Sequence, residues 1–229
     1  MTKFFTKIAS IVRKERFTID PAVPTSYLIL FFASKCIDYF RALIVFRRPM
    51  AQIFLGRNAK IKCVGKIVCG RFVKFSSDTY VDALSYDGII LGRNFSLGRG
   101  ASIECTGSLA KLGRGFVAGN NVGIGSFSFL GCAGGIFIGD DTITGNFVSM
   151  HSENHNFGRL DLPIRLQGVS NKGIHIGNNC WIGAKVTILD GANIGDNTII
   201  AAGALVKEGT YEGFSVYGGV PARKIKSLK

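Results

Sequence analysis

The 229-residue sequence lacks several patterns that would place it in a common functional class. None of its six cysteines forms a C-x-x-C pair, so a zinc or redox site of that type is not predicted. It has neither zinc-finger spacing nor a helix-turn-helix pattern, and its basic residues are not interleaved with aromatic residues in the manner of a nucleic-acid-binding module. A nucleic-acid partner is therefore not expected, although the formal net charge is +13. That charge suits an anionic membrane surface or a phosphate-rich small ligand equally well.

Long apolar runs without charge are also missing. Segment 27–46 is long enough to span a bilayer, but it contains Lys35, Asp38 and Arg41, and each charge would cost about 2.5 to 3.5 kcal/mol at the membrane centre. On a helix these three residues share one face. Basic residues flank the segment: Lys3, Lys7, Arg13, Lys14, Arg16, Arg47 and Arg48. The pattern is typical of an interfacial helix and equally of a helix that caps the end of a coil, and periodicity does not separate the two.

A cleaved signal peptide is also disfavoured, because the apolar run starts late and a lysine stands where a small residue should precede a processing site. The cysteines are scattered rather than paired: Cys36, Cys63, Cys69, Cys105, Cys132 and Cys180. We expect them to be reduced thiols in a cytoplasmic protein.

What the sequence does contain is an aliphatic residue at every sixth position. Between residues 176 and 206 these residues are Ile176, Ile182, Ile188, Ile194, Ile200 and Val206. A helix would need spacings of three and four, and an ordinary strand a spacing of two. A period of six suits short strands that turn a corner every six residues, so that three strands close one triangular coil and each anchor stacks on the anchor about 4.8 Å above it. The sequence therefore predicts an all-β chain built as a parallel β-helix, rather than a sandwich with irregularly spaced turns.

The same period recurs in earlier parts of the chain. The further anchors are Leu91, Leu97 and Ile103; Leu112, Ala118, Ile124 and Leu130; Ile138, Thr144 and Met150; and earlier coils are expected from Ile61, Ile67 and Val73. Glycine often follows the anchor, which suits corners that need positive φ or close backbone approach. The fifth place often holds a small or β-branched residue: Ala101, Val122, Ser128, Thr142, Val148, Val186, Ala192, Thr198 and Ala204.

The register of the repeat shifts where the coil is interrupted. Anchors step from Leu109 to Leu112, from Leu130 to Ile138, and from Met150 to Ile176. The last gap is too long and too polar for a corner, so we expect an extruded loop over residues 151–175. Loops on a rigid scaffold often carry the chemistry. The expected organisation is an N-terminal helical extension over residues 1–56 and a β-helix domain over residues 57–229 with that loop and a C-terminal tail.

The stretch IGNNCWIGAKVTILDGANIGDNTIIAAGALV, followed by GGVPARKIK, resembles the hexapeptide-repeat acyltransferases. The resemblance covers roughly residues 88–226 and is closest to the galactoside and maltose O-acetyltransferase branch and to bacterial polysaccharide O-acetyltransferases. It implies a left-handed β-helix, a homotrimer and acetyl-CoA as donor, with no metal. The handedness comes from the family alone, because the usual crossover rule predicts the opposite hand.

The resemblance also implies a catalytic base at the start of the extruded loop. The segment from Ile138 onward aligns without a gap with the galactoside acetyltransferases, and their base falls on His155; His151 is the neighbouring candidate. A hydroxyl is too weak an acid to attack a thioester unaided, so a base with a near-neutral pKa is needed, and imidazole provides one. Either Glu153 or a backbone carbonyl could orient His155.

Further roles are implied by matching positions. Trp181 would wall the channel in which pantetheine and acceptor meet, and Ala184 and Ala202 would leave room for the pantetheine arm. The nucleotide end of CoA would lie near three basic residues, Lys207, Arg223 and Lys226, which could pair with its phosphates.

One departure from the family concerns the acceptor. The asparagine and aspartate that contact the acceptor in galactoside acetyltransferases fall on Gly125 and Ala133, so the acceptor is expected to be a different sugar hydroxyl. With the N-terminal segment, this suggests a lipid-linked or nascent surface polysaccharide, met at the cytoplasmic membrane face.

Several alternatives differ in activity class. An N-acetyltransferase of an amino sugar could use the same base. A γ-type carbonic anhydrase would need zinc held by His151, His155 and His175. A structural or ice-binding β-helix predicts flat ranks of threonine, which the sequence lacks. A fused nucleotidyltransferase is not expected, because residues 1–56 are too few for a nucleotide-binding sheet.

Overall fold

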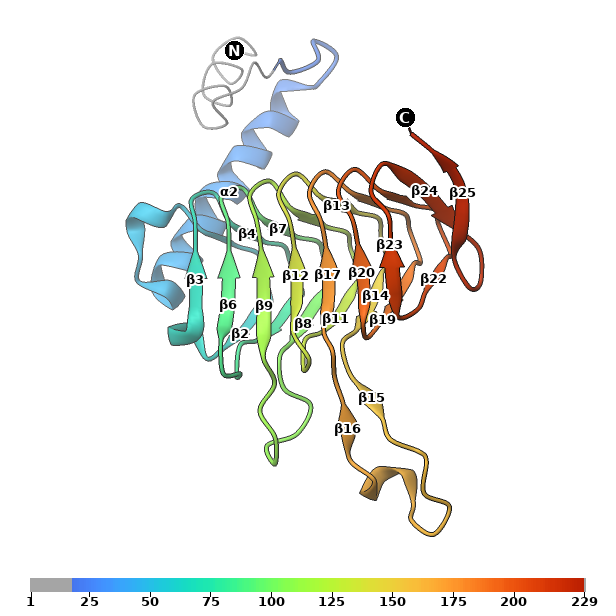
Figure 1. Ribbon diagram of the computed structural model, residues 1–229. Coiled ribbons are helices and arrows are strands. Elements are labelled where there is room, and N and C mark those ends of the chain that lie inside the picture. Colours follow the sequence, from blue (N-terminus) through green and yellow to red (C-terminus); the bar gives the residue numbers. More distant parts are fainter. Residues whose placement is uncertain (1–17, 229) are drawn as a thin grey trace.

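The computed structural model describes residues 18–228, and their short strands wind into one long coil with three faces (Figure 1). Sheet A consists of β1 (Phe54–Leu55), β4 (Lys74–Phe75), β7 (Ser96–Leu97), β10 (Gly123–Ile124), β13 (Ile143–Thr144), β18 (Trp181–Ile182), β21 (Ile199–Ile200), β24 (Ser215–Gly218) and β25 (Arg223–Ser227). Sheet B consists of β2 (Lys60–Lys62), β5 (Tyr80–Asp82), β8 (Ser102–Glu104), β11 (Phe129–Gly131), β14 (Ser149–His151), β19 (Thr187–Leu189) and β22 (Leu205–Val206). Sheet C consists of β3 (Ile67–Cys69), β6 (Gly88–Leu91), β9 (Gly115–Ala118), β12 (Ile136–Ile138), β17 (Ile174–Ile176), β20 (Ala192–Ile194) and β23 (Gly209–Tyr211). The predicted left-handed parallel β-helix is confirmed.

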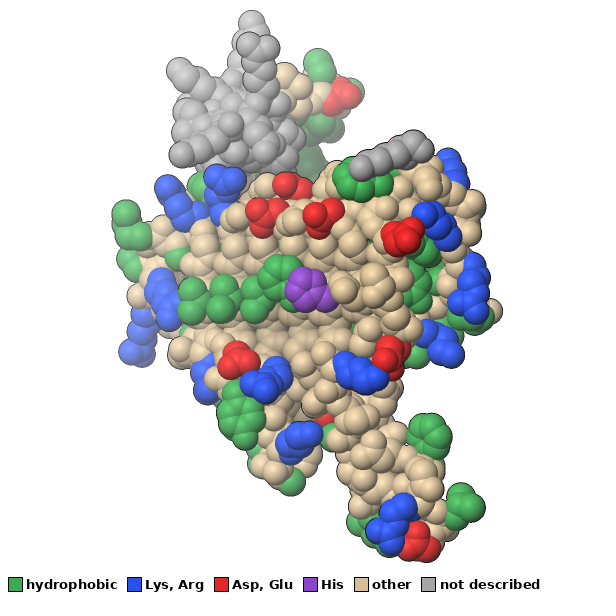
Figure 2. All heavy atoms as spheres, viewed as in Figure 1, with side chains coloured by type: hydrophobic (Ala, Val, Ile, Leu, Met, Phe, Trp, Pro, Cys, Tyr) green, Lys and Arg blue, Asp and Glu red, His purple; other side chains and the backbone are tan. Residues whose placement is uncertain are grey.

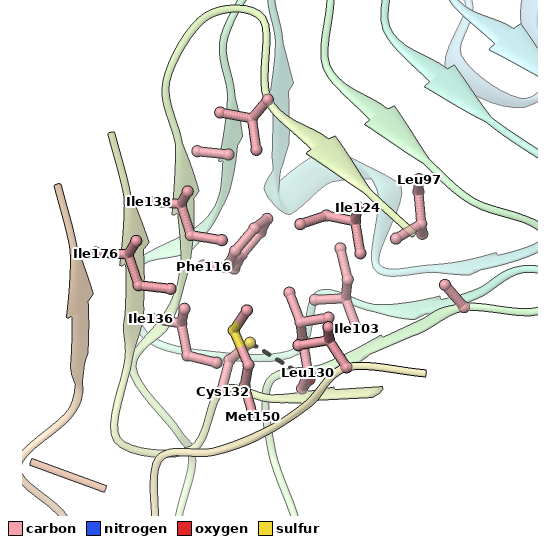
Figure 3. Close-up of a cluster of buried hydrophobic side chains, with 14 of the residues drawn as sticks. Leu97, Ile103, Phe116, Ile124, Leu130, Cys132, Ile136, Ile138, Met150 and Ile176 are labelled. Atoms are coloured by element: carbon pink, nitrogen blue, oxygen red, sulfur yellow. Dashed lines mark hydrogen bonds between the residues drawn. The ribbon is translucent and has the colours of Figure 1, made fainter. Parts of the chain in front are cut away.

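The anchors stack in register from coil to coil, as the six-residue period requires. On sheet B, Ile103 pairs with Leu130, Leu130 with Met150, Met150 with Ile188, and Ile188 with Val206. All five side chains are fully buried. Figure 3 shows anchors from the three sheets meeting in the interior of the coil. Burying one such aliphatic side chain contributes about 1.5 to 3 kcal/mol, so the column of anchors is the main source of cohesion.

Two predicted anchors, Leu109 and Leu112, are wrong. Leu112 is only half-buried and lies in the loop between β8 and β9, and Leu109 in the same loop is 83% exposed. The coil resumes with Phe116, which is fully buried. The small loop around residues 106–114 therefore interrupts the repeat, and the spacing of its leucines matched the period by coincidence.

Most glycines that follow an anchor are required by close approach rather than by positive φ. A Cβ at Gly125 would overlap the backbone carbonyl of Gly145 on the next coil. Positive φ occurs instead at the neighbouring polar corner, where Asn121 and Asp141 both have φ of 57°. These residues stack along the coil, and the Asn121 amide donates to Asp141 Oδ1 at 2.7 Å.

The C-terminal half of helix α2 (Thr25–Phe46) covers the first end of the coil. The ring of Phe46 stacks on Phe75 with centroids 5.8 Å apart, and Tyr39 packs near Phe54 at 6.2 Å. The N-terminal half runs past the coil (Figure 1). The capping interpretation of this segment thus agrees with the structure. Within residues 18–228, no helix combines the length and apolar character needed to cross a membrane.

The three charges of α2 form a single cluster on one side of the helix. Asp38 accepts hydrogen bonds from Lys35 at 2.7 Å and from Arg41 at 2.9 Å. The basic residues expected to flank the helix on its N-terminal side lie outside the described residues: Lys3, Lys7, Arg13, Lys14 and Arg16. The described part of the chain also contains three short 3₁₀ turns: η1 (Pro49–Ala51), η2 (Val64–Lys66) and η3 (Ile164–Leu166).

Candidate functional site

A long excursion leaves the coil after β14 and returns at β17, as the sequence predicts. It projects from the edge of the coil as a hairpin of β15 (Asn154–His155) and β16 (Val169–Ser170) (Figure 1). His155 lies opposite Val169 in the antiparallel pair, and its side chain is exposed. The hairpin thus carries an imidazole away from the body of its own chain.

A buried carboxylate fixes the base of this hairpin. Asp190 is 2% exposed and accepts hydrogen bonds from the backbone N–H groups of Lys172 at 2.9 Å and Gly173 at 2.8 Å. The side-chain amide of Asn154, the neighbour of His155, donates to the same carboxylate at 3.4 Å. Asp190 therefore joins both strands of the hairpin to the coil. The six-residue period did not single out Asp190 as a site residue.

A second buried contact fixes the outgoing strand. The Ser152 hydroxyl donates to the carbonyl of Gly131 at 2.8 Å and accepts from the N–H of Gly134 at 3.0 Å. Because both strands of the hairpin are held at their base, the backbone position of His155 is fixed although its side chain faces solvent.

The far end of the hairpin combines an internal polar clasp with exposed apolar side chains. Gln167 donates to the carbonyl oxygens of Arg159 at 2.6 Å and Leu162 at 2.8 Å, and it accepts from the N–H of Arg159 at 2.9 Å. The side chains of Phe157 and Leu160 are exposed at 74% and 101%. An ordered loop that presents apolar side chains to water is a surface suited to contact with another chain.

The other two histidines belong to the coil. His151 ends β14, where its Nε2 is hydrogen-bonded to Ser149 Oγ at 2.7 Å, and partial burial lowers its pKa below the ordinary value of 6.5. His175 lies on β17 and stacks on Phe137 with ring centroids 4.4 Å apart. Within the described residues, no group of three histidine, cysteine or acidic side chains could hold a metal ion. The carbonic anhydrase alternative therefore gains no support from this chain.

Trp181 lies on a different face of the coil. It stands on β18 of sheet A and is 54% exposed, beside a hollow of about 350 Å³. The hollow is lined by Asn179, Trp181, Asn197, Ile199, Phe214 and Leu228. Sheet pairing aligns Trp181 with Ile199, Ile199 with Val216, and Val216 with Lys226. Trp181 and Lys226 thus belong to one row of paired residues across sheet A.

The other residues expected to bind the donor divide into two groups. Ala184 and Ala202 occupy successive coils at the corner that follows sheet A, and Arg223 lies opposite Gly218 on β25. They therefore share the Trp181 side of the coil with Lys226. Lys207 does not: it is exposed at the turn after β22, where its N–H donates to Tyr211 Oη at 3.1 Å.

The structure does not bring Trp181 and His155 together within one chain. Trp181 lines the hollow that contains Leu228, next to the C-terminal end, whereas the hairpin projects from the opposite edge of the coil (Figure 1). A site that uses both residues must therefore combine two copies of the chain.

A second hollow, of about 390 Å³, lies between the two extruded loops. It is lined by Tyr86, Lys111, Leu112, Arg114, Ala133 and Asn171. Ala133, one of the two positions at which the acceptor contact of galactoside acetyltransferases is missing, therefore borders a hollow with two basic side chains. The other position, Gly125, directly follows β10 of sheet A.

The cysteines are free thiols, as expected. Burial raises the pKa of the Cys69 thiol to about 12, and burial also raises the pKa values of Cys132 and Cys180. Because the thiolate is the reactive form, these three side chains are poor nucleophiles at neutral pH.

Part of the chain matches the model of a known protein family. Residues 173–208 match the model of the family described as bacterial transferase hexapeptide (six repeats). The chain is similar to solved structures of AntD, an N-acyltransferase from Bacillus cereus. One of these, a mutant in complex with dTDP and coenzyme A, superposes with a TM-score of 0.57 at 20% identity, covering 76% of this chain and 86% of that one. At that identity the likeness concerns the fold.

Sequence relatives are acetyltransferases by name. Rv3034c of Mycobacterium tuberculosis, named as an acetyltransferase, is 28% identical over 57% of this chain, and the match spans about half (49%) of its own length. WbbJ of Escherichia coli, named as a lipopolysaccharide biosynthesis O-acetyl transferase, is 29% identical over 61% of this chain and 72% of its own. The galactoside O-acetyltransferase of Escherichia coli is 46% identical over 55 residues, 24% of this chain and 27% of its own. These matches confirm the resemblance to the hexapeptide-repeat acyltransferases.

Proposed function

We propose that this chain is an acetyl-CoA-dependent O-acetyltransferase that modifies a sugar hydroxyl of a bacterial surface polysaccharide or its precursor. The observation that carries the proposal is an exposed histidine on a hairpin clamped at its base by Asp190, in a chain with the hexapeptide repeat. The relatives named as O-acetyltransferases favour oxygen as the acceptor atom.

In the proposed reaction His155 is the general base. Its imidazole takes the proton of the sugar hydroxyl while the hydroxyl oxygen forms a bond to the acetyl carbon. The bond between that carbon and the sulfur of CoA then breaks, and the proton held by His155 goes to the leaving thiolate. The products are an acetyl ester and free CoA, so no cysteine nucleophile is required.

The sheet A side of the coil suits the donor. Trp181 offers a large flat side chain, Ala184 and Ala202 leave the adjoining corner unobstructed, and Arg223 and Lys226 supply positive charge for phosphate groups. Lys207 lies on another side of the coil, which gives less support to its proposed role in binding the CoA phosphates. Because the hairpin and sheet A are apart in one chain, we further propose a homotrimer in which His155 of one copy meets Trp181 of the next.

The acceptor side is proposed on chemical grounds. The hollow beside Ala133 offers Tyr86 and Asn171 for hydrogen bonds and Lys111 and Arg114 for charge. The acceptor is therefore proposed to be a sugar other than a simple galactoside, presented on a lipid carrier or a growing chain at the cytoplasmic face of the membrane. An amino sugar acetylated on nitrogen is the second candidate, because the AntD neighbours are N-acyltransferases.

The proposal is tested by thiol release from acetyl-CoA with a panel of saccharides and amino sugars, measured against a blank for the exposed Cys36 and Cys63. His155→Ala should lower kcat by about 10²- to 10⁴-fold, whereas His151→Ala should retain most of the activity. Unchanged turnover in His155→Ala would overturn the assignment of the base. If acetyl were transferred only to amino sugars, the acceptor atom would be nitrogen and the proposed O-acetyltransferase activity would be wrong.

A further inference from the structure

Large apolar side chains are exposed along α2, both beside the coil and on the half that runs past it. They are between 38% and 77% exposed: Tyr27, Ile29, Leu30, Phe31, Ile37, Phe40, Ile44 and Val45. The buried residues of the helix are Leu28, Ala42 and Phe46, which share one side. At 100° per residue the exposed set spreads over a wide arc, broader than the narrow seam of a coiled coil. The arc is therefore an extended, largely apolar surface rather than a single helix-pairing stripe, and the ion pair of Asp38 with Arg41 lies within it.

Positive charge surrounds this end of the coil. Between residues 39 and 77 the sequence has nine basic residues and no acidic residue; the basic residues are Arg41, Arg47, Arg48, Arg57, Lys60, Lys62, Lys66, Arg71 and Lys74. Ion pairs with neighbouring segments join Arg41 to Asp38 and Lys62 to Asp82. Within residues 39–77 itself no acidic residue offsets these nine positive charges, and Figure 2 shows Lys and Arg side chains at the end of the coil that carries β3.

We propose that the exposed side of α2 and the basic first coil together form a binding surface for an anionic lipid bilayer. The apolar side chains enter the interface between headgroups and acyl chains, and the basic side chains face the lipid phosphates. The affinity of such surfaces rises with both buried apolar area and positive charge. This inference deepens the proposed function and rests on it for one point only, that the acceptor is carried by the membrane.

A second copy of the chain fits this surface less well. The same end of another copy would bring nine more basic residues against these nine, and like charges placed against one another oppose association. An anionic bilayer offers the complementary charge instead. Its attraction for basic side chains falls off over about 10 Å in 0.1 M salt, so binding should weaken as salt is added.

The test is flotation of the full chain with vesicles. One set contains equal parts phosphatidylcholine and phosphatidylglycerol, and the other contains phosphatidylcholine alone. We expect about tenfold or greater preference for the anionic vesicles at low salt. Two variants should each lose about tenfold in binding. The first replaces exposed apolar residues (Leu30→Gln with Ile37→Gln and Ile44→Gln), and the second reverses charge on the first coil (Arg57→Glu with Lys60→Glu).

Matched controls make the same chemical changes elsewhere. Lys111→Glu with Arg165→Glu reverses charge on the two extruded loops, and Leu109→Gln with Val220→Gln removes exposed apolar side chains far from α2. Both controls should float like the unmodified chain. Circular dichroism of every variant confirms that the fold is retained.

Three results would overturn the surface assignment. The first is that the chain binds neutral and anionic vesicles equally well. The second is that both surface variants bind vesicles as well as the unmodified chain does. The third is that the α2 variant dissociates into smaller oligomers, as measured by light scattering, while its vesicle binding is unchanged. The last would make the helix a subunit contact. Acetyl transfer to soluble saccharides is measured separately without vesicles. Its absence from a chain that still floats would reject the proposed function and leave the bilayer surface standing.

Discussion

The carboxylate of Asp190 accepts the backbone N–H of Gly173 at 2.8 Å, across 17 residues of chain. Gly173 is the last residue of the excursion before β17, and Asp190 follows β19 on the next coil. The contact ties the returning strand of the hairpin to the coil beneath it. Because Asn154 donates to the same carboxylate, the position of His155 depends on Asp190.

Replacing Asp190 should therefore affect both stability and turnover. In Asp190→Ala, the N–H groups of Lys172 and Gly173 lose their partner, and each unsatisfied buried group costs about 1 to 3 kcal/mol. Denaturant unfolding measures this loss. We also expect kcat to fall with little change in the KM for acetyl-CoA, because the hairpin moves while sheet A does not.

The control for Asp190 is Glu208→Ala. Glu208 forms an exposed ion pair with the Lys172 ammonium, and such pairs contribute about 0 to 1 kcal/mol. If Asp190→Ala were no more damaging than Glu208→Ala, Asp190 would not be a positioning residue. Asp190→Asn should lie between the two, since it keeps an oxygen acceptor but adds donors that face the two N–H groups.

The partly buried environment of His151 predicts how this side chain titrates. Partial burial favours the neutral imidazole, so the pKa lies below 6.5 in the folded chain. The unfolded chain therefore binds more protons over the window just below pH 6.5, and this contribution to stability, present above that pH, is lost as pH falls through the folded pKa. An NMR titration of the His151 ring should give a midpoint below 6.5. Phe129→Ala, which removes a ring 5.4 Å away, should raise it. A midpoint at or above 6.5 in the unmodified chain would contradict this environment.

The stacked anchors should dominate stability. Ile188→Ala in the sheet B column should lower the free energy of unfolding by about 2 to 5 kcal/mol, because the fully packed interior leaves a cavity. Leu109→Ala, in the exposed loop that interrupts the repeat, should change it by about 0.5 kcal/mol or less. Equal effects at the two positions would mean that the anchors are not the source of cohesion.

The sequence predicted the coil well because its period reports directly which side chains face inward. Every predicted small or β-branched residue in the fifth place is buried, from Ala101 to Ala204. The predictions for Leu109 and Leu112 were wrong because an inserted loop can by chance place leucines at the spacing of the repeat. The six-residue spacing predicts that a side chain points inward only when the spacing continues on both sides of that residue.

The candidate site was harder to predict from the sequence than the coil. Asp190 stands two residues after an anchor, in the column that holds Cys105, Cys132 and Ser152 on earlier coils. An acidic residue among small buried ones was a signal, but its partners are backbone groups of a loop whose path the sequence does not specify. Likewise, the separation of Trp181 from His155 depends on which coil face each occupies, and the family resemblance did not assign faces.

The central claim is that His155 of one copy works with Trp181 of the next. It is tested most directly by co-expressing His155→Ala and Trp181→Ala chains with different tags and purifying oligomers that contain both. Each parent should be inactive, and about one third of the sites in the purified mixed cyclic trimers should have both intact residues. The account predicts that acetyl transfer returns to about that fraction of the unmodified rate. Mixed oligomers no more active than either parent would contradict it.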